Sequence, residues 1–388
     1  MFRNIQLNYG SRDVRLTEQV ALHFDVPGTP VGMFPVGSGN INDTFLAIYR
    51  TSYSETRCII QRVNKKVFRK PEAIVKNFRV VTEHVHHRLE KERNSADRIW
   101  QLPRLIPAKT SSDFHLDEAG EYWRAITLID SAVAYDQAQG VEHACEAGTV
   151  LGQFHRLVMD LAPESLEVTI PGFHHTPGYL AAYDRTLDSE VARECVKADA
   201  LTADLCRFVS ARRELCGILE AAHGRGDLRV RIMHGDPKIN NILMDNITGR
   251  GTSIIDLDTV GSGLIHWDYG DAVRSLCNPA GEDASALNDI EFSLELCQAF
   301  TAGYIGQAAD FMTGADRNYL YDSIRLITFE LGLRFFQDHL AGNVYFKTRH
   351  PRHNLDRASV QFRLCERMEA HEKAIRRLIA TCGEKASG

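Results

Sequence analysis

The stretch from Arg231 to Arg274 constrains this chain more than any other part of its sequence. It contains an H-G-D tripeptide that ends at Asp236, then Asn241 after four intervening residues, and later an apolar pair that leads into Asp256. A carboxylate such as Asp236 can accept the proton of an attacking hydroxyl, while an amide oxygen and a second carboxylate can hold the magnesium that bridges nucleotide phosphates. This order of groups is what phosphoryl transfer from a nucleotide requires.

The spacing matches the kinase catalytic-loop pattern H-x-D-x-x-x-x-N, followed by a metal-binding Asp on the next strand. Asp and Asn between short apolar runs are also ordinary turn formers, so the context has to support the motif. Here Asp245–Gly249 predicts a turn between two strands, and that hairpin would bring Asn241 and Asp256 together. We therefore expect Asp236 to be the catalytic base, with His234 supporting the loop.

The length and composition indicate a globular protein with two lobes and one cleft. The chain has 388 residues, 44% of them hydrophobic and 25% charged, so it exceeds one typical domain and can bury a sizeable core. We expect the N-lobe to span residues 1–130 and the C-lobe residues 131–388. The net charge of −6 argues against a nucleic-acid partner.

The cysteine pattern and the N-terminus bear on where the protein works. The nine cysteines are scattered and never form C-x-x-C, which indicates reduced thiols and supports neither a zinc site nor a disulfide framework. The N-terminus has no apolar signal segment, and no stretch is long enough to span a membrane. We expect a cytoplasmic protein, a monomer or weak homodimer, without a membrane partner.

The predicted N-lobe contains candidate nucleotide contacts. Val36–Tyr49 predicts a strand, a glycine turn at Gly37-Ser38-Gly39 and a second strand. Glycines in such a turn let backbone amides approach phosphate oxygens. A short strand then ends at Arg62, which either reaches the phosphates or stays in solvent as an edge-strand residue. Glu83, on a helix predicted over Glu72–Glu92, is a possible partner for this arginine.

A strand over Tyr122–Asp130 leads to the predicted hinge near Leu128–Ser131, where we expect adenine to lie against the backbone at Ile129. Beyond the hinge the hydrophobic periodicity predicts a mainly helical region. The helices expected along the chain are Asp13–Phe24, Glu72–Glu92, Glu142–Leu161, Ile290–Tyr304, Arg317–Leu340 and Val360–Thr381.

Several polar residues leave alternatives open. Either Asp268 or Asp271 could accept backbone amides of the catalytic loop, and we take Asp271 as the supporting residue. Asp258 lies two residues after Asp256, on the same side of a predicted strand, and is either a second metal ligand or a hydrogen-bonding support. Arg334 lies on a largely apolar helix, so it needs an internal carboxylate or a ligand oxygen.

A histidine pair also leaves a choice open. His174 and His175 lie in a loop bounded by Pro and Gly, and they either face a ligand or belong to the core or surface.

The motifs together resemble a known superfamily. H-G-D-x-K-x-N-N-I-L, I-I-D-L-D-T and W-D-Y-G-D resemble the aminoglycoside phosphotransferase and choline kinase superfamily. The chain is more closely similar to bacterial N-acetylhexosamine 1-kinases. That closer likeness extends over nearly the whole length, through the glycine turn, Gln61-Arg62, N-N-I-L-M-D, Gly332–Phe335, Tyr345-Phe346 and His353–Leu355.

The resemblance implies an α+β, protein-kinase-like fold with a small antiparallel-sheet N-lobe and a larger, mainly helical C-lobe. It implies a kinase that uses ATP and Mg²⁺ to phosphorylate the anomeric hydroxyl of an N-acetylhexosamine or related hexose. Asp236 would be the base, Asn241 and Asp256 the metal ligands, and Asn40, Arg334 and Tyr345 the sugar-side residues. The chain departs from its relatives at Asn40, where they have His, and at Gly235, where they have Asn.

Other functions are open to such a sequence. A related small-molecule kinase could take an aminoglycoside, choline, homoserine or methylthioribose as acceptor. A non-catalytic nucleotide-binding pseudokinase would be marked by loss of Asp236, Asn241 or Asp256, and all three are present. A metal-binding module built on the 16 histidines lacks convincing ligand spacing.

Overall fold

The computed structural model describes residues 19–36, 41–92, 98–284 and 286–387. The chain divides into two compact units, the first drawn from within Met1–His86, Leu102–Asp130 and Glu167–Ile170. The second comprises His87–Gln101, Ser131–Leu166 and Pro171–Gly388. One division between the two units lies between Asp130 and Ser131.

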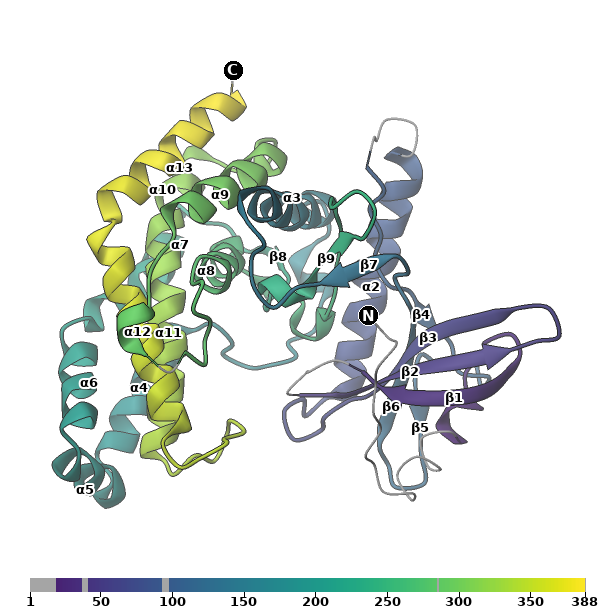
Figure 1. The fold of residues 1–388 in the computed structure, drawn as a ribbon, viewed down its shortest axis with the longest axis horizontal. Helices are drawn as coiled ribbons and strands as arrows, with labels where there is room; N and C mark the ends of the chain where they lie inside the picture. The colour runs from purple at the N-terminus through teal and green to yellow at the C-terminus, as the bar shows by residue number, and fades with distance from the viewer. Residues whose placement is uncertain (1–18, 37–40, 93–97, 285, 388) are drawn as a thin grey trace. The chain divides into compact units, whose positions relative to one another are not determined.

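The first unit is built around an antiparallel sheet in the order β1-β2-β3-β6-β4, with β5 also paired to β6 (Figure 1). In β3, Cys58 and Ile60 are fully buried between more exposed neighbours, which is the period-two pattern of a half-buried strand. Its strands are β1 (Thr29–Pro35), β2 (Asp43–Arg50), β3 (Glu55–Arg62), β4 (Leu105–Ile106), β5 (His115–Leu116) and β6 (Tyr122–Thr127).

Helix α2 (Pro71–Glu92) forms where the sequence predicts it, with Ile74, Phe78, Val81 and Val85 on its buried face. The Arg124 guanidinium of β6 lies 5.1 Å from the centroid of the Phe78 ring. The same guanidinium donates two hydrogen bonds to the side-chain oxygen of Gln61, at 2.7 and 3.0 Å. An arginine thus joins the helix to the sheet of this unit.

The second unit holds two small antiparallel sheets next to the catalytic motif. One has the order β10-β9-β7 and the other pairs β11 with β8. The turn predicted over Asp245–Gly249 joins β9 to β10, and the Asp245 carboxylate accepts the backbone amides of Ile247 and Thr248. The strands are β7 (Ala132–Ala134), β8 (Arg231–Met233), β9 (Ile242–Asp245), β10 (Gly251–Ile254) and β11 (Gly261–Gly263).

Helices make up the rest of the second unit (Figure 1). Helix α11 packs against α8 and α12, and its apolar residues Phe329, Leu333 and Phe336 are fully buried. The helices are α3 (Val141–Val158), α4 (Thr176–Leu187), α5 (Glu190–Ala198), α6 (Ala200–Ser210), α7 (Ile218–Gly224), α8 (Ile265–Leu276), α9 (Leu294–Ala308), α10 (Gly314–Asn318), α11 (Leu320–Leu340), α12 (His353–Ala370) and α13 (Glu372–Ser387).

The structure corrects the prediction for the C-terminal region. We expected one helix over Val360–Thr381, but α12 ends at Ala370 and α13 begins at Glu372. His371 separates them with φ −101° and ψ 8°, outside the helical region. Apolar residues continue at helical spacing across this break, so the period alone could not locate it.

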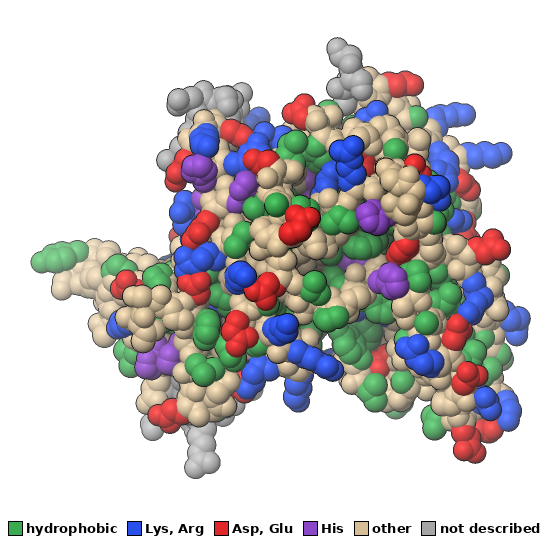
Figure 2. Space-filling model, turned by 180° about the vertical axis from the view of Figure 1, so that it is seen from behind, with side chains coloured by type: hydrophobic (Ala, Val, Ile, Leu, Met, Phe, Trp, Pro, Cys, Tyr) green, Lys and Arg blue, Asp and Glu red, His purple; other side chains and the backbone are tan. Residues whose placement is uncertain are grey.

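Charged side chains are spread over the surface. On the face drawn in Figure 2, Lys and Arg side chains alternate with Asp and Glu, and neither sign gathers into one large patch. Among the described residues, no helix combines the length and the apolar character needed to cross a membrane.

Helices α3 and α9 approach each other closely through their backbones. A Cβ atom on Gly148 would overlap the carbonyl of Phe300, and one on Gly303 would overlap the carbonyl of Cys145. Each helix thus has a glycine at the point where it contacts the backbone of the other helix. Gly306, on the same helix as Gly303, faces open space.

We expect Gly303→Ala to lower the free energy of unfolding by about 1–3 kcal/mol, because the added methyl group forces two helices apart. Gly306→Ala is the matched control and should be neutral or stabilising by up to about 1 kcal/mol, since alanine is the better helix former. Thermal unfolding of both variants measures the difference. Equal melting temperatures would contradict the close approach of α3 and α9.

Candidate active site

The predicted catalytic loop follows β8 and begins with a glycine in an unusual conformation. Gly235 has φ +89°, a region that L side chains rarely adopt. A Cβ atom at this position would lie 2.6 Å from the carbonyl oxygen of Thr259. Glycine therefore relieves both backbone strain and crowding directly before Asp236.

Asp268 of α8 holds the loop by its backbone. Its carboxylate accepts the amide of His234 at 2.6 Å and the amide of Gly235 at 2.8 Å. The His155 ring lies 2.8 Å from the same carboxylate and is held on its other side by the Tyr304 hydroxyl at 2.9 Å. Burial opposes ionisation of Asp268, but the bonds from His155 and the loop lower its pKa below the usual value. A fully buried anion thus fixes the loop.

This arrangement corrects our choice of Asp271 as the residue that supports the loop. The Asp271 carboxylate instead accepts from the Arg274 guanidinium at 2.8 and 2.9 Å. Arg274 also bonds Glu282 at 2.5 Å. Both aspartates lie on α8, three residues apart, so they are neighbours on the helix surface and their spacing does not separate their roles.

His234 ties the loop to the segment that carries Asp256. Its Nε2 lies 3.0 Å from the carbonyl oxygen of Ile255, and its Nδ1 accepts the amide of Asp236 at 3.3 Å. Burial lowers the pKa of His234, which matches a neutral ring with one donor and one acceptor nitrogen. The carbonyl of His234 also accepts the Thr259 hydroxyl at 3.0 Å.

Asp236 lies beside an amide and an ammonium group. The Asn241 side-chain nitrogen donates to the Asp236 backbone carbonyl at 2.7 Å. The Lys238 ammonium lies 2.7 Å from the Asp236 carboxylate. Burial opposes the charge of Lys238, but Asp236 and Asp256 outweigh it and raise its pKa. Lys238 lies within the motif H-G-D-x-K-x-N-N-I-L, and no role was expected for it from the sequence.

Asp256 follows β10 in the left-handed conformation, with φ 66° and ψ 58°. The next residues, Leu257–Thr259, form a 3-10 turn. The expectation that Asp258 points the same way as Asp256 on a strand is therefore wrong, because the alternation of a strand has ended. Asp258 is 3% exposed. The Ile255 amide donates to the Asn241 carbonyl at 2.8 Å, which joins the segments of the two predicted metal ligands.

No group of three or more His, Cys, Asp or Glu suited to a metal ion occurs among the described residues. A magnesium site does not need such a group, because Mg²⁺ commonly takes one or two carboxylates together with substrate phosphates and waters. The Asn241 amide nitrogen is already used, so its oxygen is the atom that suits a cation.

Arg334 on α11 is surrounded by aromatic rings. Its guanidinium carbon lies 5.8 Å from the ring centroid of Phe173, 5.0 Å from that of Tyr179 and 5.7 Å from that of Phe346. In the part of the chain that the structure describes, no carboxylate comes within ion-pair distance of Arg334. The sequence left two possible partners for Arg334, an internal carboxylate or a ligand oxygen. Of these, the internal carboxylate is not present among the described residues.

The loop after α11 carries Tyr345 and is organised by a buried carboxylate. Asp338, 1% exposed, accepts the backbone amides of Val344, Tyr345 and Phe346 at 2.9, 2.8 and 3.0 Å. The Asn354 side chain donates to the same carboxylate at 2.8 Å. Tyr345 is 59% exposed, and its ring packs edge-on against Phe346. Asp338 therefore sets where these two rings lie.

The two loop histidines have different surroundings. His174 is buried and bonds Glu330 at 3.0 Å and the Gly235 carbonyl at 3.1 Å. His175 accepts the amide of Gly178 at the start of α4. Glu330 was not singled out from the sequence, because its helix reads as largely apolar and its partner lies 156 residues away.

The predicted nucleotide contacts belong to the first unit. Arg62 pairs with Asp43 of the neighbouring strand at 2.6 Å, whereas Glu83 pairs with Arg79 at 2.8 Å. Ile129 is 9% exposed. Their roles toward a nucleotide stay predictions. The predicted residues Gly37, Ser38, Gly39 and Asn40 lie outside the described residues.

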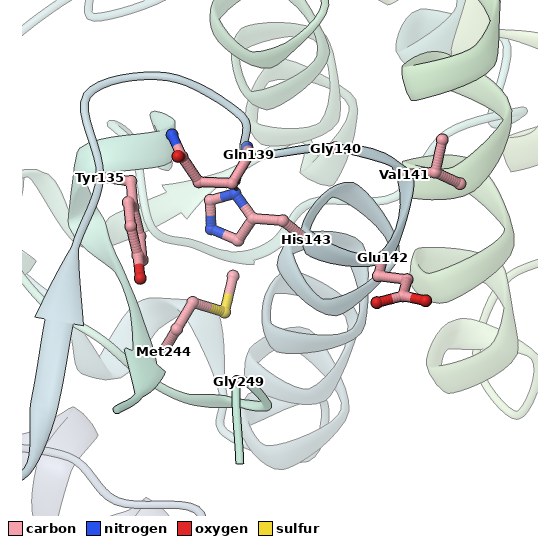
Figure 3. Close-up of a pocket in the computed structure, with 8 residues that line it drawn as sticks. All are labelled: Tyr135, Gln139, Gly140, Val141, Glu142, His143, Met244 and Gly249. Carbon is pink, nitrogen blue, oxygen red and sulfur yellow. Dashed lines mark hydrogen bonds between the residues drawn. The ribbon is translucent and has the colours of Figure 1, made fainter. Parts of the chain in front are cut away.

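A cavity of about 480 Å³ lies in the second unit at the start of α3 (Figure 3). The rings of Tyr135 and His143 and the thioether of Met244 point toward one another there, while Glu142 points away. None of the predicted catalytic or acceptor-side residues lines it. The lining residues are Tyr135, Gln139, Gly140, Val141, Glu142, His143, Met244 and Gly249.

We expect Asp268→Asn to lower the free energy of unfolding by about 3–5 kcal/mol, because one oxygen cannot replace a carboxylate that accepts from three donors. Asp310→Asn, at an exposed position, is the matched control and should change stability by less than about 0.5 kcal/mol. Chemical denaturation of both variants is the measurement. A loss at Asp268 no larger than that of the control would contradict the holding role.

Solved structures with the same fold include several small-molecule kinases. One is a microcompartment-associated aminopropanol kinase, 18% identical, with 94% of this chain and 98% of that chain covered and a TM-score of 0.60. A choline kinase from Cryptosporidium parvum Iowa II is 14% identical, with 88% and 90% covered and a TM-score of 0.54. An aminoglycoside phosphotransferase from Alicyclobacillus acidocaldarius is 12% identical, with 98% and 99% covered and a TM-score of 0.54.

At these identities the likeness establishes the fold, and the predicted α+β, protein-kinase-like fold class is confirmed. The model of the phosphotransferase enzyme family matches residues 35–304, which include β8, β9 and the catalytic loop between them. The chain therefore belongs to the phosphotransferase enzyme family, as an enzyme that transfers a phosphoryl group to an alcohol acceptor.

Proposed function

We propose that this kinase uses ATP and Mg²⁺ to phosphorylate the anomeric hydroxyl of an N-acetylhexosamine or related hexose, giving the sugar 1-phosphate. Asp236 is the base that accepts the proton of the attacking hydroxyl. Its backbone is fixed by its neighbours in the loop, so that its carboxylate can be presented in one direction. Positioning of this kind supplies much of the rate in phosphoryl transfer, which asks little covalent chemistry of the protein.

Asn241 and Asp256 are the residues that would hold the magnesium ion, which bridges the phosphates and offsets their charge. Lys238 contributes a second positive charge beside Asp236, 2.7 Å from its carboxylate. It lies close enough to Asp256 for the two charges to interact. The ammonium thus offsets part of the negative charge of the two carboxylates and can attract an anionic substrate toward them.

The observation that carries the choice of acceptor is Arg334. The residue lies close to the catalytic loop through a short chain of contacts. His174 bonds the Gly235 carbonyl, the Phe173 and His174 ring centroids are 4.1 Å apart, and Phe173 faces the Arg334 guanidinium. The rings contact the guanidinium by their faces, so its N–H donors stay available for ligand oxygens. Aromatic faces beside oriented donors suit a neutral acceptor rich in hydroxyl groups.

The charges on this side of the second unit disfavour a cationic acceptor. A choline or amino-alcohol kinase can receive the ammonium group of its substrate with carboxylates or with aromatic faces. Here the Glu330 carboxylate accepts from His174 and Thr176, and Asp271 is paired with Arg274. The Arg334 cation already lies against the three aromatic rings, where it repels another cation.

An amino-alcohol or aminoglycoside acceptor is the second candidate, because similar structures include kinases named for aminopropanol and choline. Their low identity supports the fold they share with this chain and leaves the acceptor to be decided by assay.

The acceptor can be tested by ADP release from ATP and Mg²⁺ with a panel of free sugars, their 1-O-methyl glycosides and amino alcohols. The sugars are GlcNAc, GalNAc, glucose, galactose and mannose, and the amines are choline, ethanolamine and 1-amino-2-propanol. We expect turnover with free sugars only, because the methyl glycosides lack the anomeric hydroxyl. Asp236→Asn should lower kcat by about 10²–10⁴-fold while ATP binding by calorimetry is kept.

Faster turnover of the amines than of any sugar would favour the second candidate. Equal turnover of sugars and methyl glycosides would place the acceptor hydroxyl elsewhere on the sugar. Undiminished activity in Asp236→Asn would remove this residue as the base.

Replacing Arg334 tests the acceptor side directly. Arg334→Gln should raise the KM for the sugar about 10- to 100-fold, as expected for a lost hydrogen bond to a charged donor worth about 1.5–3 kcal/mol. The KM for ATP should stay the same. Arg363→Gln is the matched control, since this α12 residue pairs only locally with Glu366. An unchanged sugar KM in Arg334→Gln would contradict the assignment.

A further inference from the structure

His174 has a strained backbone and buried polar contacts that the catalytic assignment does not use. Its φ is +56°, in the left-handed region that residues other than glycine rarely adopt. The residue is 5% exposed, and its ring packs near Trp267 of α8, with the ring centroids 5.7 Å apart. Such a conformation persists only when the surrounding contacts impose it, and it often marks a functional position.

Both ring nitrogens of His174 face oxygen acceptors. Nδ1 lies 3.0 Å from one Glu330 carboxylate oxygen, and Nε2 lies 3.1 Å from the Gly235 carbonyl oxygen. The other Glu330 oxygen accepts the Thr176 hydroxyl at 2.5 Å. A neutral imidazole has one N–H and cannot donate to both acceptors. The geometry is therefore that of a protonated ring beside an ionised carboxylate.

The bond to Gly235 completes the hold on the catalytic loop. Asp268 accepts the Gly235 amide at 2.8 Å, and His174 donates to the carbonyl of the same residue. That carbonyl belongs to the peptide bond that leads into Asp236. The orientation of this peptide sets where the Asp236 side chain begins.

We infer that His174 is a positioning residue, whose protonated ring, held by Glu330, donates to the Gly235 carbonyl and fixes the peptide that precedes Asp236. The inference rests on the proposed role of Asp236 as the base. It gives α11 a direct connection to the catalytic loop, one helical turn before Arg334.

Deprotonation would break this connection at one particular bond. The Glu330 carboxylate can only accept, so a neutral His174 keeps its proton on Nδ1 and turns a bare Nε2 toward the Gly235 carbonyl. Two acceptors then face each other, and the loop loses its hold on that side. The preceding peptide still donates its Gly235 N–H to Asp268, so we expect a misaligned loop and not an unfolded one.

The charges around His174 favour the protonated ring. Burial opposes the charge, but Glu330 outweighs it and raises the pKa of His174 above the usual 6.5, and Asp271 on α8 acts in the same direction. Arg334 of α11 and Glu220 of α7 also face Glu330. Because the pKa is raised by folding, the contribution of the ring is complete below about 6.5 and is lost as the pH rises through the higher value.

Two variants separate the parts of this inference. His174→Asn suits the left-handed backbone but is too short to bridge Glu330 and Gly235. Glu330→Gln keeps the shape and can donate to Nδ1 of a neutral ring, which leaves Nε2–H to bond the Gly235 carbonyl at every pH. His223→Asn is the control, because His223, a residue of α7, also bonds a backbone carbonyl, that of Leu228.

The first test is the pH dependence of kcat, from pH 6 to 10, with a saturating acceptor from the panel. The wild type should lose activity as His174 deprotonates. His174→Asn should have a kcat about 10- to 100-fold lower at neutral pH, with KM values changed less than about threefold, and should lack this alkaline decline. Glu330→Gln should keep most of its kcat and also lack the decline. His223→Asn should follow the wild type.

The second test needs no acceptor and separates failure of this inference from failure of the proposed function. Amide hydrogen exchange of the segment 233–241 should be faster in His174→Asn than in the wild type, and unchanged in Glu330→Gln. Unchanged exchange in His174→Asn overturns the inference whatever the acceptor is. So does an alkaline decline that persists in both variants. If no acceptor is turned over by the wild type, the proposed function fails and the exchange result decides the role of His174.

Discussion

The peptide that joins Gly235 to Asp236 is the constraint on which the candidate active site depends. Its left-handed glycine puts the preceding amide against the buried Asp268 carboxylate and its own carbonyl against His174. Both partners are charged and come from segments far apart in the sequence. The two peptides that flank Gly235 are thus held by different partners, and the Asp236 amide is held by Nδ1 of His234, so the backbone that carries the Asp236 side chain is fixed. The geometry around Asp236 is therefore set in part by two buried side chains, Asp268 and His174.

Helix α11 connects this constraint to the acceptor side. Glu330, Arg334 and Asp338 follow one another at four-residue spacing, which places them along one face of the helix. Each serves a different segment: Glu330 holds His174, Arg334 faces three aromatic rings, and Asp338 holds the loop that carries Tyr345. Buried polar groups are costly unless their hydrogen bonds are made, so this face has a single workable arrangement. The helix thus fixes the spacing between catalytic loop and acceptor side.

The sequence predicted what depends on neighbouring residues. The turn at Asp245–Gly249 and helix α2 follow from local spacing and periodicity, whereas the fold class followed from the family resemblance of the motifs. Choices that depend on tertiary contacts escaped it. The sequence does not distinguish Asp268 from Asp271. Only the packing of α8 places Asp268 against the loop and Asp271 against Arg274. Likewise, strand alternation gave a wrong direction for Asp258, because Asp256 leaves the strand in a left-handed conformation.

The way Arg334 is held bears on what it can bind. A carboxylate partner would lie in the guanidinium plane and occupy the N–H donors, as Asp271 does for Arg274. Aromatic rings contact the guanidinium by their faces and leave the in-plane donors unused. The three rings around Arg334 therefore hold the charge in place without satisfying it. We therefore expect these N–H donors to prefer oxygens that arrive with a substrate. This preference distinguishes an oxygen-rich acceptor from a cationic one.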